Sequence, residues 1–336
     1  MTVVDALAGI GFMSVETTTT SPQPVLPCRA WIEEAVPWGL LASTLAGSCG
    51  AWHWAFDLCS HFRWYYFVAA AVFGVLIWRK RRRSAMAALG MTLLWNGGLL
   101  APYYLPSSQS AIANGGTNVS LVSLNIFTAN KNKRAVIDYL RQRSADLVVV
   151  MEVDERWEQA LAELLDLYPH QFIQSRPDNF GIGLLSREPL AESRFVNAGH
   201  THVPTIVARV EREGRAFMIV ATHPLPPIGA SNTRERDAQL RAVADTARAS
   251  SLPCVVVGDF NATPWSSAFR DLTARSGLRD SALGRGVQGS WNAKSPLIRI
   301  PIDHVLVPAN VKVIRRAVGP DVGSDHFPVE VEFVLP

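Results

Sequence analysis

Cysteine is scarce in this chain and shows no ligand or pairing pattern. Only 4 cysteines occur in 336 residues, and none forms a CxxC pair or another zinc spacing. The sequence therefore indicates neither a disulfide framework nor a zinc module. Cys254 lies inside an apolar run, which is typical of a buried residue, and Cys28, Cys49 and Cys59 are expected to be unpaired.

A large charge excess is also lacking. The formal net charge is +3, and from Leu121 onward the chain has 25 basic and 24 acidic residues. Much of the excess is one cluster, residues 79–83, of sequence RKRRR. A protein that binds many nucleic-acid phosphates usually presents a broad basic face. The near-neutral C-terminal part argues against such a face but leaves local basic patches open.

The N-terminus lacks a basic segment followed by a short apolar one, so no cleaved signal peptide is expected. It is instead rich in Thr, Ser and Pro, and we expect residues 1–35 to form a disordered tail.

Long apolar runs then occupy residues 36–105, which we interpret as a membrane region with three transmembrane helices. The three segments are Val36–Phe56, Trp64–Trp78 and Ser84–Tyr104. His53 and Asp57 are costly in lipid and are expected at an interface. Buried helices of a soluble domain are the alternative.

The basic cluster predicts the orientation of this region. Basic residues favour short cytoplasmic loops, so the third segment would run outward. The following domain would then lie on the periplasmic or extracellular side of the cell (inner) membrane. An even number of spans would reverse this orientation.

After a polar linker at residues 106–118, the pattern of residues 119–336 predicts strands interleaved with amphipathic helices. This indicates an α/β sandwich with two mixed sheets. Helices are expected over Lys131–Ser144, Glu155–Leu167, Asn232–Ala249 and Trp265–Ser276. Strands are expected over Val119–Phe127, Leu147–Met151, Phe172–Gln174, Gly181–Leu185, Thr205–Val210, Ala216–Ala221, Cys254–Val257, Ile302–Val307, Val311–Arg316 and Val329–Val334.

The strongest chemical signal follows the strand that ends at Gly258. Asp259 and Asn261 are two residues apart, so in an extended stretch they point to the same side. The carboxylate suits orienting or deprotonating a water, and the amide suits donation to a phosphoryl oxygen. The alternative is that Asn261 or Thr263 caps the next helix.

Two further motifs place imidazole and carboxylate groups at strand ends. His326, next to Asp325, is suited to donating to a phosphate oxygen or to stabilising developing charge. Asp303 begins a strand and is suited to accepting from the His326 ring.

Three upstream residues also follow strands. Glu152 ends a buried run and suits Mg²⁺ or Mn²⁺, and Asn125 offers an amide oxygen beside it. His223 follows a further strand as a phosphate or transition-state donor, although a structural role is the commoner fate of a lone histidine. Because each polar position ends or begins a different strand, the set predicts one cleft between two sheets.

These motifs, in this order and spacing, resemble the endonuclease/exonuclease/phosphatase family. The matching segments are SLN at 123–125, VMEV at 150–153, ATHP at 221–224, GDFNA at 258–262, PIDH at 301–304 and GSDHFP at 323–328. The resemblance covers about two thirds of the chain and implies a four-layer α-β-β-α sandwich that hydrolyses phosphoesters with a divalent metal, usually Mg²⁺.

The resemblance also implies residue roles. Asn125 and Glu152 correspond to the metal-proximal pair, with Asp325 completing the metal site. Asp259 and Asn261 correspond to the pair that handles the nucleophilic water and the phosphate. His326 corresponds to the phosphate-contacting imidazole and Asp303 to its orienting partner, while His223 occupies a position that varies between branches of the family.

Three functions remain open from the sequence. The first is a membrane-anchored, metal-dependent phosphodiester hydrolase of nuclease type, and the second is a phosphomonoesterase or lipid-headgroup phosphoesterase. The third is a non-catalytic binding module, which the intact set of carboxylates and histidines opposes. No feature indicates a protein partner.

Several polar residues have no assigned role. Arg176 precedes a segment that the family places near the cleft. Arg234, Arg236 and Gln239 share a helix, which we interpret as a solvated face, with phosphate contact as the alternative.

Overall fold

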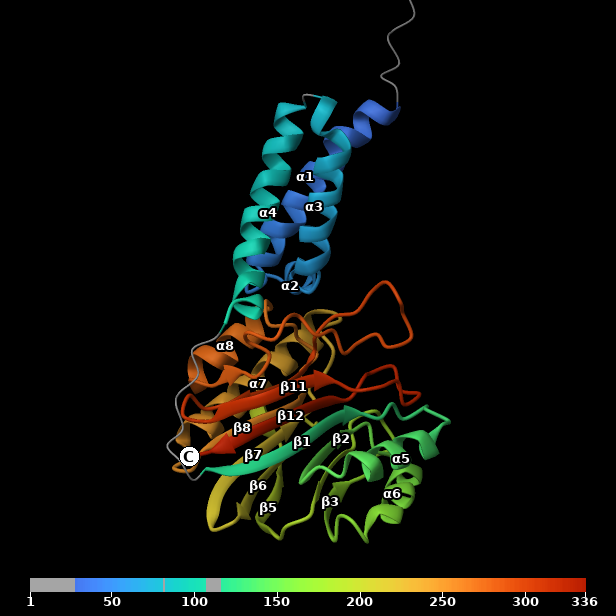
Figure 1. Cartoon of the computed structure of the whole chain (residues 1–336), viewed down its shortest axis with the longest axis vertical. Coiled ribbons are helices and arrows are strands. Elements are labelled where there is room, and N and C mark those ends of the chain that lie inside the picture. The colour runs from blue at the N-terminus through green and yellow to red at the C-terminus, as the bar shows by residue number, and fades with distance from the viewer. Residues whose placement is uncertain (1–27, 81, 107–115) are drawn as a thin grey trace, which may run out of the picture.

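A computed structural model describes residues 28–80, 82–106 and 116–336. A column of helices stands on a β-sandwich, with the catalytic motifs all in the sandwich (Figure 1). Residues 1–27 of the expected tail lie outside the described residues. From Cys28 to residue 35, however, the chain is helical, so the expectation of a disordered tail is wrong there.

The column consists of three long helices and a short one at its base. The long helices are α1 (Cys28–Ser48), α3 (Arg63–Ile77) and α4 (Arg83–Tyr104), and α2 (Trp54–Ser60) lies where the column meets the sandwich (Figure 1). Small and branched apolar side chains pack the column, namely Ala70, Ile77, Ala85 and Leu89.

The first apolar segment is not one helix. The chain turns between Ser48 and Trp54. Gly50 lies in this turn, and its backbone passes so close to Asp57 that a Cβ on Gly50 would lie 2.6 Å from the carboxylate. A continuous span over Val36–Phe56 is therefore wrong. His53 caps α2 by accepting from the Ala55 N–H.

Length and apolar composition distinguish the helices of the column. Among the described residues, α4 alone is long and apolar enough to cross a membrane. The pair formed by α2 and Arg63–Lys80, bent by 61°, would give a second span if it is counted as one. The apolar pattern predicts three spans, whereas one helix, or two if the bent pair counts as one, has the length and composition of a span.

The sandwich consists of two six-stranded mixed sheets, each with one parallel strand pair at its centre. The first sheet has the order β11-β12-β1-β2-β4-β3, and its strands are β1 (Thr117–Asn125), β2 (Leu147–Met151), β3 (His170–Gln174), β4 (Ile182–Ser186), β11 (Lys312–Val318) and β12 (Val329–Leu335). The second has the order β5-β6-β7-β8-β10-β9, and its strands are β5 (Leu190–Val196), β6 (Thr205–Arg212), β7 (Arg215–Thr222), β8 (Cys254–Asp259), β9 (Arg279–Asp280) and β10 (Asp303–Val307).

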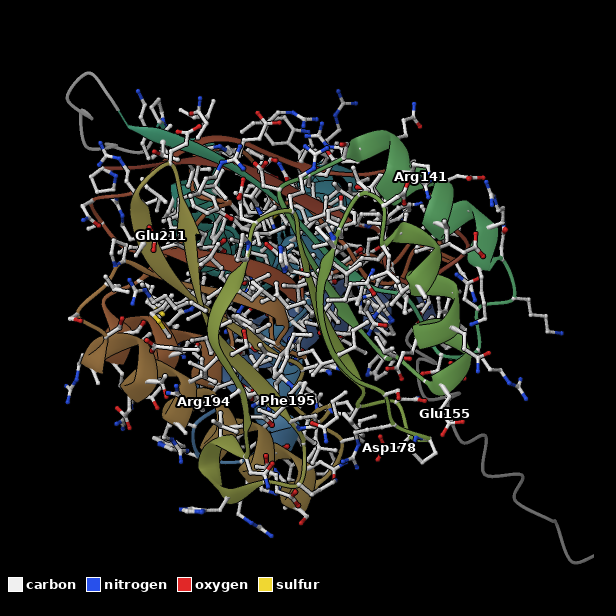
Figure 2. All side chains as sticks on the ribbon, turned by 90° about the horizontal axis from the view of Figure 1, so that it is seen from below. Arg141, Glu155, Asp178, Arg194, Phe195 and Glu211 are labelled. Carbon is white, nitrogen blue, oxygen red and sulfur yellow. The ribbon has the colours of Figure 1, made fainter. Side chains whose placement is uncertain are left out.

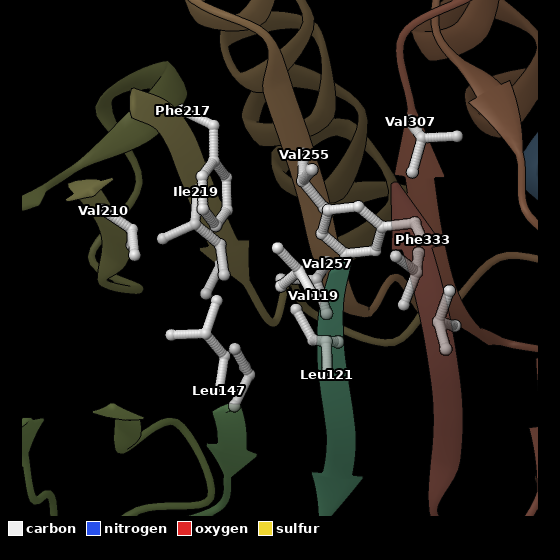
Figure 3. Close-up of a cluster of buried hydrophobic side chains, with 14 of the residues drawn as sticks. Val119, Leu121, Leu147, Val210, Phe217, Ile219, Val255, Val257, Val307 and Phe333 are labelled. Atoms are coloured by element: carbon white, nitrogen blue, oxygen red, sulfur yellow. The ribbon is translucent and has the colours of Figure 1, made fainter. Parts of the chain in front are cut away.

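Alternation along the strands builds the core. In β1, Val119 and Leu121 face the second sheet, while Val122 and Leu124 face the outer helices. Figure 3 shows the cluster between the sheets, where Phe217 from one sheet meets Phe333 from the other with ring centroids 6.1 Å apart. Both faces of each central strand are therefore buried, as in other two-sided sheets.

Helices cover the outer face of each sheet, which confirms the four-layer α-β-β-α sandwich. The first sheet is covered by α5 (Lys133–Arg143) and α6 (Glu155–Leu161), and the second by α7 (Ala230–Ala249) and α8 (Ser267–Ser276). Seen from below, charged side chains such as Arg141, Glu155 and Glu211 lie at the rim of this layered body (Figure 2).

Some boundaries differ from the sequence pattern. The first strand begins at Thr117 and not at Val119, so the linker ends two residues earlier than expected. Asn132 caps α5 by accepting from the Ala135 N–H, which starts that helix at Lys133. The edge strand β5 was not predicted, because it carries exposed polar residues and a register shift between Ala191 and Arg194.

Candidate active site

The chemistry-bearing residues meet at one end of the central strands. Asn125 ends β1, Glu152 directly follows β2, and the parallel register of these strands places Asn125 opposite Met151. Asp259 ends β8, and the antiparallel register pairs it with Asp303 at the start of β10. The side chains therefore come from both sheets, as the sequence predicts for a cleft between them.

Gly258 fixes the backbone just before Asp259. Its φ is +144°, and a Cβ there would lie 1.9 Å from the carbonyl oxygen of Thr222. Only glycine fits this close approach of β7 and β8. Because His223 follows Thr222, the same contact brings His223 and Asp259 side by side.

Asp259 is the centre of the site. Its Oδ2 lies 3.5 Å from Nε2 of His223 and 3.6 Å from Nε2 of His326, and its Oδ1 accepts from the Asn261 N–H at 2.9 Å. Burial raises the pKa of Asp259, but the imidazoles of His326 and His223 and the Asn261 N–H together lower it to about 2. Asp259 is therefore ionised throughout the physiological range.

His326 is held between two carboxylates. Its Nδ1 lies 2.8 Å from Oδ2 of Asp303, and its Nε2 faces Asp259. Burial lowers the pKa of His326, but the carboxylates of Asp303 and Asp259 outweigh it and raise the pKa to about 10. The structure thus brings together Asp303 and His326 as the sequence predicts, with His326 as an imidazolium cation near neutral pH.

His223 is buried, and burial lowers the pKa of its imidazole. Its contact with Asp259 outweighs that effect, so the pKa lies above its ordinary value. Its Nδ1 has no partner among the described residues. A buried histidine with an unused nitrogen beside a carboxylate differs from a satisfied structural histidine.

Asn125 connects two carboxylates. Its Nδ2 donates to Oε1 of Glu152 at 3.0 Å and to Oδ2 of Asp259 at 3.3 Å. Its Oδ1 accepts from the Phe127 N–H at 3.0 Å. In this arrangement the amide acts as a donor that holds the two carboxylates near each other, and a role of its oxygen as a metal ligand stays a prediction.

Glu152 and Asp325 have oxygen atoms suited to a hard cation. Glu152 Oε2 accepts from the Thr128 N–H at 3.0 Å. Asp325 Oδ2 accepts from Trp291 Nε1 at 3.3 Å, whereas its buried Oδ1 has no partner among the described residues. With Asp259, three carboxylates line one cavity, and such an oxygen-rich, anionic set fits Mg²⁺.

Among the described residues, Asp259, Asp303 and His326 form a close group of possible metal ligands, with ligand atoms within 4.8 Å of one another. Two of these residues are already paired through the 2.8 Å contact between Asp303 and His326. Because His326 is protonated on both ring nitrogens when charged, it has no lone pair for a metal. Asp303 and His326 are thus engaged with each other, and a cation at Glu152 and Asp325 stays a prediction from the sequence.

Asn261 does not cap the following helix. Ser266 does so, accepting from the Phe269 N–H at 3.2 Å, and α8 accordingly begins at Ser267 and not at Trp265. Asn261 instead adopts a left-handed conformation with φ +48° and donates from Nδ2 to the Pro224 carbonyl at 3.0 Å. Its side chain lines the cavity, so the functional interpretation is retained.

A cavity of about 380 Å³ opens over these groups. Its polar side contains Glu152, His223, Asp259, Asn261, Asp325 and His326. Its other lining residues include Phe180, Trp291 and, from the base of the helical column, Leu58, His61 and Phe62. Sequence reasoning missed the last three because they lie about 200 residues from Asp259 and carry no motif. The charge of Asp57 within an apolar segment was the sequence signal that could have indicated a contact between this segment and the sandwich.

Three of the four unassigned polar residues, Arg176, Arg236 and Gln239, have structural partners. Arg176 donates from Nε and Nη2 to the carboxylate of Asp178, at 2.9 and 2.6 Å. Arg236 is fully buried, and Gln239 is buried and donates to Thr222. The interpretation of a solvated face is therefore wrong for Arg236 and Gln239, and it holds for the exposed Arg234.

The sequence matches the model of the Endonuclease/Exonuclease/phosphatase family over residues 122–326, which is more than half of the chain. The chain belongs to this family. As a family member with the sandwich fold and an assembled polar site, it is a phosphoesterase, a hydrolase of phosphate ester bonds. No match is found among curated proteins.

Solved structures share the fold of this family member. TDP2 from D. rerio, complexed with single strand DNA product, is 19% identical with a TM-score of 0.56, covering 65% of this chain and 99% of its own. A family protein from Bacteroides thetaiotaomicron is 18% identical with a TM-score of 0.54, covering 67% and 97%. Sphingomyelinase C from Streptomyces griseocarneus is 16% identical with a TM-score of 0.50, covering 64% and 99%.

Proposed function

We propose that this protein is a membrane-held hydrolase of phosphodiesters that works with a divalent metal ion, most simply Mg²⁺. The observation that supports it is the position of Asp259. It is an ionised carboxylate placed between two imidazoles, in a cavity that also contains two further carboxylates. A water and a phosphate group can be bound together there.

The side chains divide the work between water and phosphate. Asp259, with its low pKa, accepts a hydrogen bond from the attacking water and orients it toward phosphorus. The imidazolium of His326 donates from Nε2 to a nonbridging oxygen, where negative charge develops in the transition state. Asp303 holds the His326 ring and keeps it charged, while His223 and Asn261 supply further donors.

Glu152 and Asp325 would hold the metal ion, as their oxygen atoms and the unpartnered Asp325 Oδ1 suggest. When bound, the ion offsets phosphate charge and stabilises the transition state of in-line displacement. During that displacement the bond from water to phosphorus forms while the opposite ester bond breaks and the alcohol leaves.

A phosphomonoesterase of the same fold is the second candidate. A monoester carries one more negative charge than a diester near neutral pH, and such a charge is best bound by additional cations. The described residues that line the cavity include no lysine or arginine. This composition favours the diester.

Two observations support attachment to a membrane. Of 23 large hydrophobic side chains that are exposed among the described residues, 18 lie between Trp31 and Leu105, although this region is much the smaller part of the chain. Such a concentration of exposed apolar surface marks a contact with a membrane or a protein. In addition, Trp52, Trp64 and Tyr104 are exposed at the base of the column, where an interfacial aromatic belt would lie.

The same arrangement suggests an orientation. The described members of the basic cluster, Arg79, Lys80, Arg82 and Arg83, lie between the end of α3 and the start of α4, at the end of the column opposite to the sandwich (Figure 1). Lys80 in that cluster pairs with Glu33 of α1. If the cluster lies in the cytoplasm, the sandwich lies on the periplasmic or extracellular side of the cell membrane. The test is a reporter enzyme that is active only in the cytoplasm, fused after Pro336. Activity of this fusion would contradict the inferred orientation.

The activity is tested with the full chain in detergent, using bis-p-nitrophenyl phosphate and p-nitrophenyl phosphate with Mg²⁺. We expect faster turnover of the diester, loss of turnover with EDTA, and a fall in kcat of about 10³-fold in Asp259→Asn. Asp245→Asn, an exposed carboxylate on α7, is the matched control and should retain activity. Full activity in Asp259→Asn, or turnover that resists EDTA, would contradict the proposal.

A further inference from the structure

The helical column is bound to the sandwich by a buried ion pair. Nη2 of Arg236 lies 2.8 Å from Oδ2 of Asp57, and both side chains are fully buried. Asp57 Oδ1 also accepts from the N–H and the hydroxyl of Ser267, at 2.9 and 3.0 Å. A carboxylate buried in this way is retained only where its partners are fixed, so α2 has a defined position on α7 and α8.

The turn after α2 is fixed by a second contact. The Thr263 N–H donates to Nδ1 of His61 at 3.2 Å, and the Thr263 hydroxyl lies at the same distance from that nitrogen. Thr263 is only two residues beyond Asn261. The segment Leu58–Phe62 is therefore held directly beside the catalytic loop. Asp57, just before the segment, and His61, within it, provide the two contacts that fix it.

This segment supplies an apolar wall of the catalytic cavity. Leu58 and Phe62 line the cavity together with four apolar residues of the sandwich, Pro226, Pro227, Ile228 and Ile300. The catalytic groups line the same cavity. A cavity of about 380 Å³ is larger than a phosphate group needs, and it lies within the ~300–1,000 Å³ typical of ligand sites.

The composition of the wall selects among phosphodiesters. A nucleic acid carries a further charge on each neighbouring phosphate, and proteins bind those charges with lysine and arginine. The described residues that line the cavity include neither lysine nor arginine. A hydrocarbon group beside the scissile phosphate would instead bury its surface against Leu58 and Phe62.

The wall also lies beside the base of the helical column. Ile228 lines the cavity and is 70% exposed, so the apolar lining continues to the outer surface. Trp64 and Tyr104, whose rings lie 6.2 Å apart, are exposed at the same base. If this base meets a membrane surface, the cavity receives a substrate whose apolar part comes from the lipid side.

We infer that Leu58 and Phe62 form a subsite for the apolar substituent of the phosphodiester, so that the N-terminal region determines specificity and the substrate is a lipid-like phosphodiester. This inference rests on the proposed hydrolysis of phosphodiesters. Its distinctive element is the origin of the subsite, because the wall comes from the helical column and not from the sandwich that carries the catalytic residues.

The test compares two diesters that differ only in the substituent, p-nitrophenyl methyl phosphate and p-nitrophenyl butyl phosphate. Both have the same scissile bond, and the butyl group is short enough to stay out of detergent micelles. With the full chain in detergent and Mg²⁺, we expect kcat/KM for the butyl ester to exceed that for the methyl ester by about tenfold or more. A thymidine oligonucleotide should be cleaved with a lower kcat/KM than the butyl ester.

Variants then locate the subsite. Phe62→Ser and Leu58→Ser should each lower the butyl-to-methyl ratio severalfold, and Phe62→Leu should lower it less. Ile314→Ser, an exposed apolar residue on β11 outside the cavity, is the matched control and should leave the ratio unchanged. Because a ratio is compared within each variant, partial loss of folded protein does not affect it.

The outcomes separate the inference from the proposed function. EDTA-sensitive turnover of both esters with a wild-type ratio near one would overturn the subsite and leave the phosphodiesterase intact. An unchanged ratio in both serine variants, or preferred cleavage of the oligonucleotide, would overturn it as well. Absence of turnover on every diester would contradict the proposed function itself.

Discussion

The Nδ1 atom of His326 lies 2.8 Å from Oδ2 of Asp303, and both side chains are buried. This contact joins the first residue of β10 to the loop before β12, and thus joins the two sheets at the site. A second acid–imidazole pair, Asp280 and His304, lies nearby with 3.7 Å between Oδ2 and Nδ1 but does not line the catalytic cavity. Substituting the acid of each pair therefore compares an acid–imidazole pair at the catalytic cavity with a similar pair outside it.

Asp303→Asn should lower kcat by about 10²-fold or more, because the His326 imidazolium loses its carboxylate partner. The charges of Asp303 and Asp259 raise the pKa of His326, so removing one of them lowers that pKa from about 10. The proton is then lost at lower pH, and the alkaline limb of the pH–rate profile should shift downward. Asp280→Asn should leave this limb in place, and equal profiles in the wild type and Asp303→Asn would contradict the assigned contact.

Glu152→Gln should weaken metal binding while preserving the size of the side chain. In the wild type, Mg²⁺ should raise Tm, because a ligand that binds only the folded state stabilises it. At the same Mg²⁺ concentration, Glu152→Gln should show a smaller rise and should need more Mg²⁺ for half-maximal activity. Glu155→Gln, an exposed carboxylate on α6, serves as the control. A full Mg²⁺-dependent rise in Tm in Glu152→Gln would place the ion elsewhere.

Arg236→Met should destabilise the chain by about 3–5 kcal/mol, because it leaves the buried Asp57 carboxylate without its cation. Asp57→Asn should cost less, since Asp237 remains 2.8 Å from Arg236 Nη2. The double variant Asp57→Asn/Arg236→Met should be more stable than the sum of the two changes predicts. The measurement is denaturation of the full chain in detergent, followed by tryptophan fluorescence. Strictly additive losses would show that the pair does not couple the column to the sandwich.

The exposed pair Arg141 and Asp166 provides the control for that cycle. Its atoms lie as close as 2.5 Å, but both side chains are largely exposed to water. Its removal should therefore lower the free energy of unfolding far less than removal of the buried pair does.

Cys254 should make stability depend on alkaline pH. Burial raises the pKa of its thiol to about 12, whereas the unfolded thiol ionises near ~8.5. The contribution is thus fully present below pH ~8.5 and is lost as the pH rises toward the folded value, by about 2 kcal/mol at pH 10. Other groups affect both proteins equally, so the wild type should lose stability more steeply than Cys254→Ala between pH 8 and 10. Parallel slopes would contradict the burial of the thiol.

Much of the sandwich and its site could be predicted because the signals are local. Runs such as Val255–Val257 end in a polar residue, and the alternation of side chains places that residue at the sheet edge. The convergence of Asp259, Asp303 and His326 then follows from strand register, and the structure shows it. The position of Gly258 before Asp259 has a local reason as well, in its positive φ.

The remainder depended on partners distant in sequence. Arg236 is charged and lies on a helix whose composition is polar, so its complete burial follows only from Asp57, 179 residues away. The turn at Gly50 likewise has no clear signal in the sequence, because no charged residue interrupts residues 36–56. Hydropathy measures composition, whereas both features are set by tertiary contact.

The ion pair between Asp57 and Arg236 has a consequence for any shortened form of the protein. A fragment that begins at β1 would keep every catalytic side chain, yet its Arg236 would face solvent and the cavity would lose one wall. Such a fragment would be a different enzyme in its choice of substrate, although its reaction would be the same. On the proposed attachment and subsite, the helices that would hold this protein at a surface and the residues that would choose its substrate are one continuous stretch of chain.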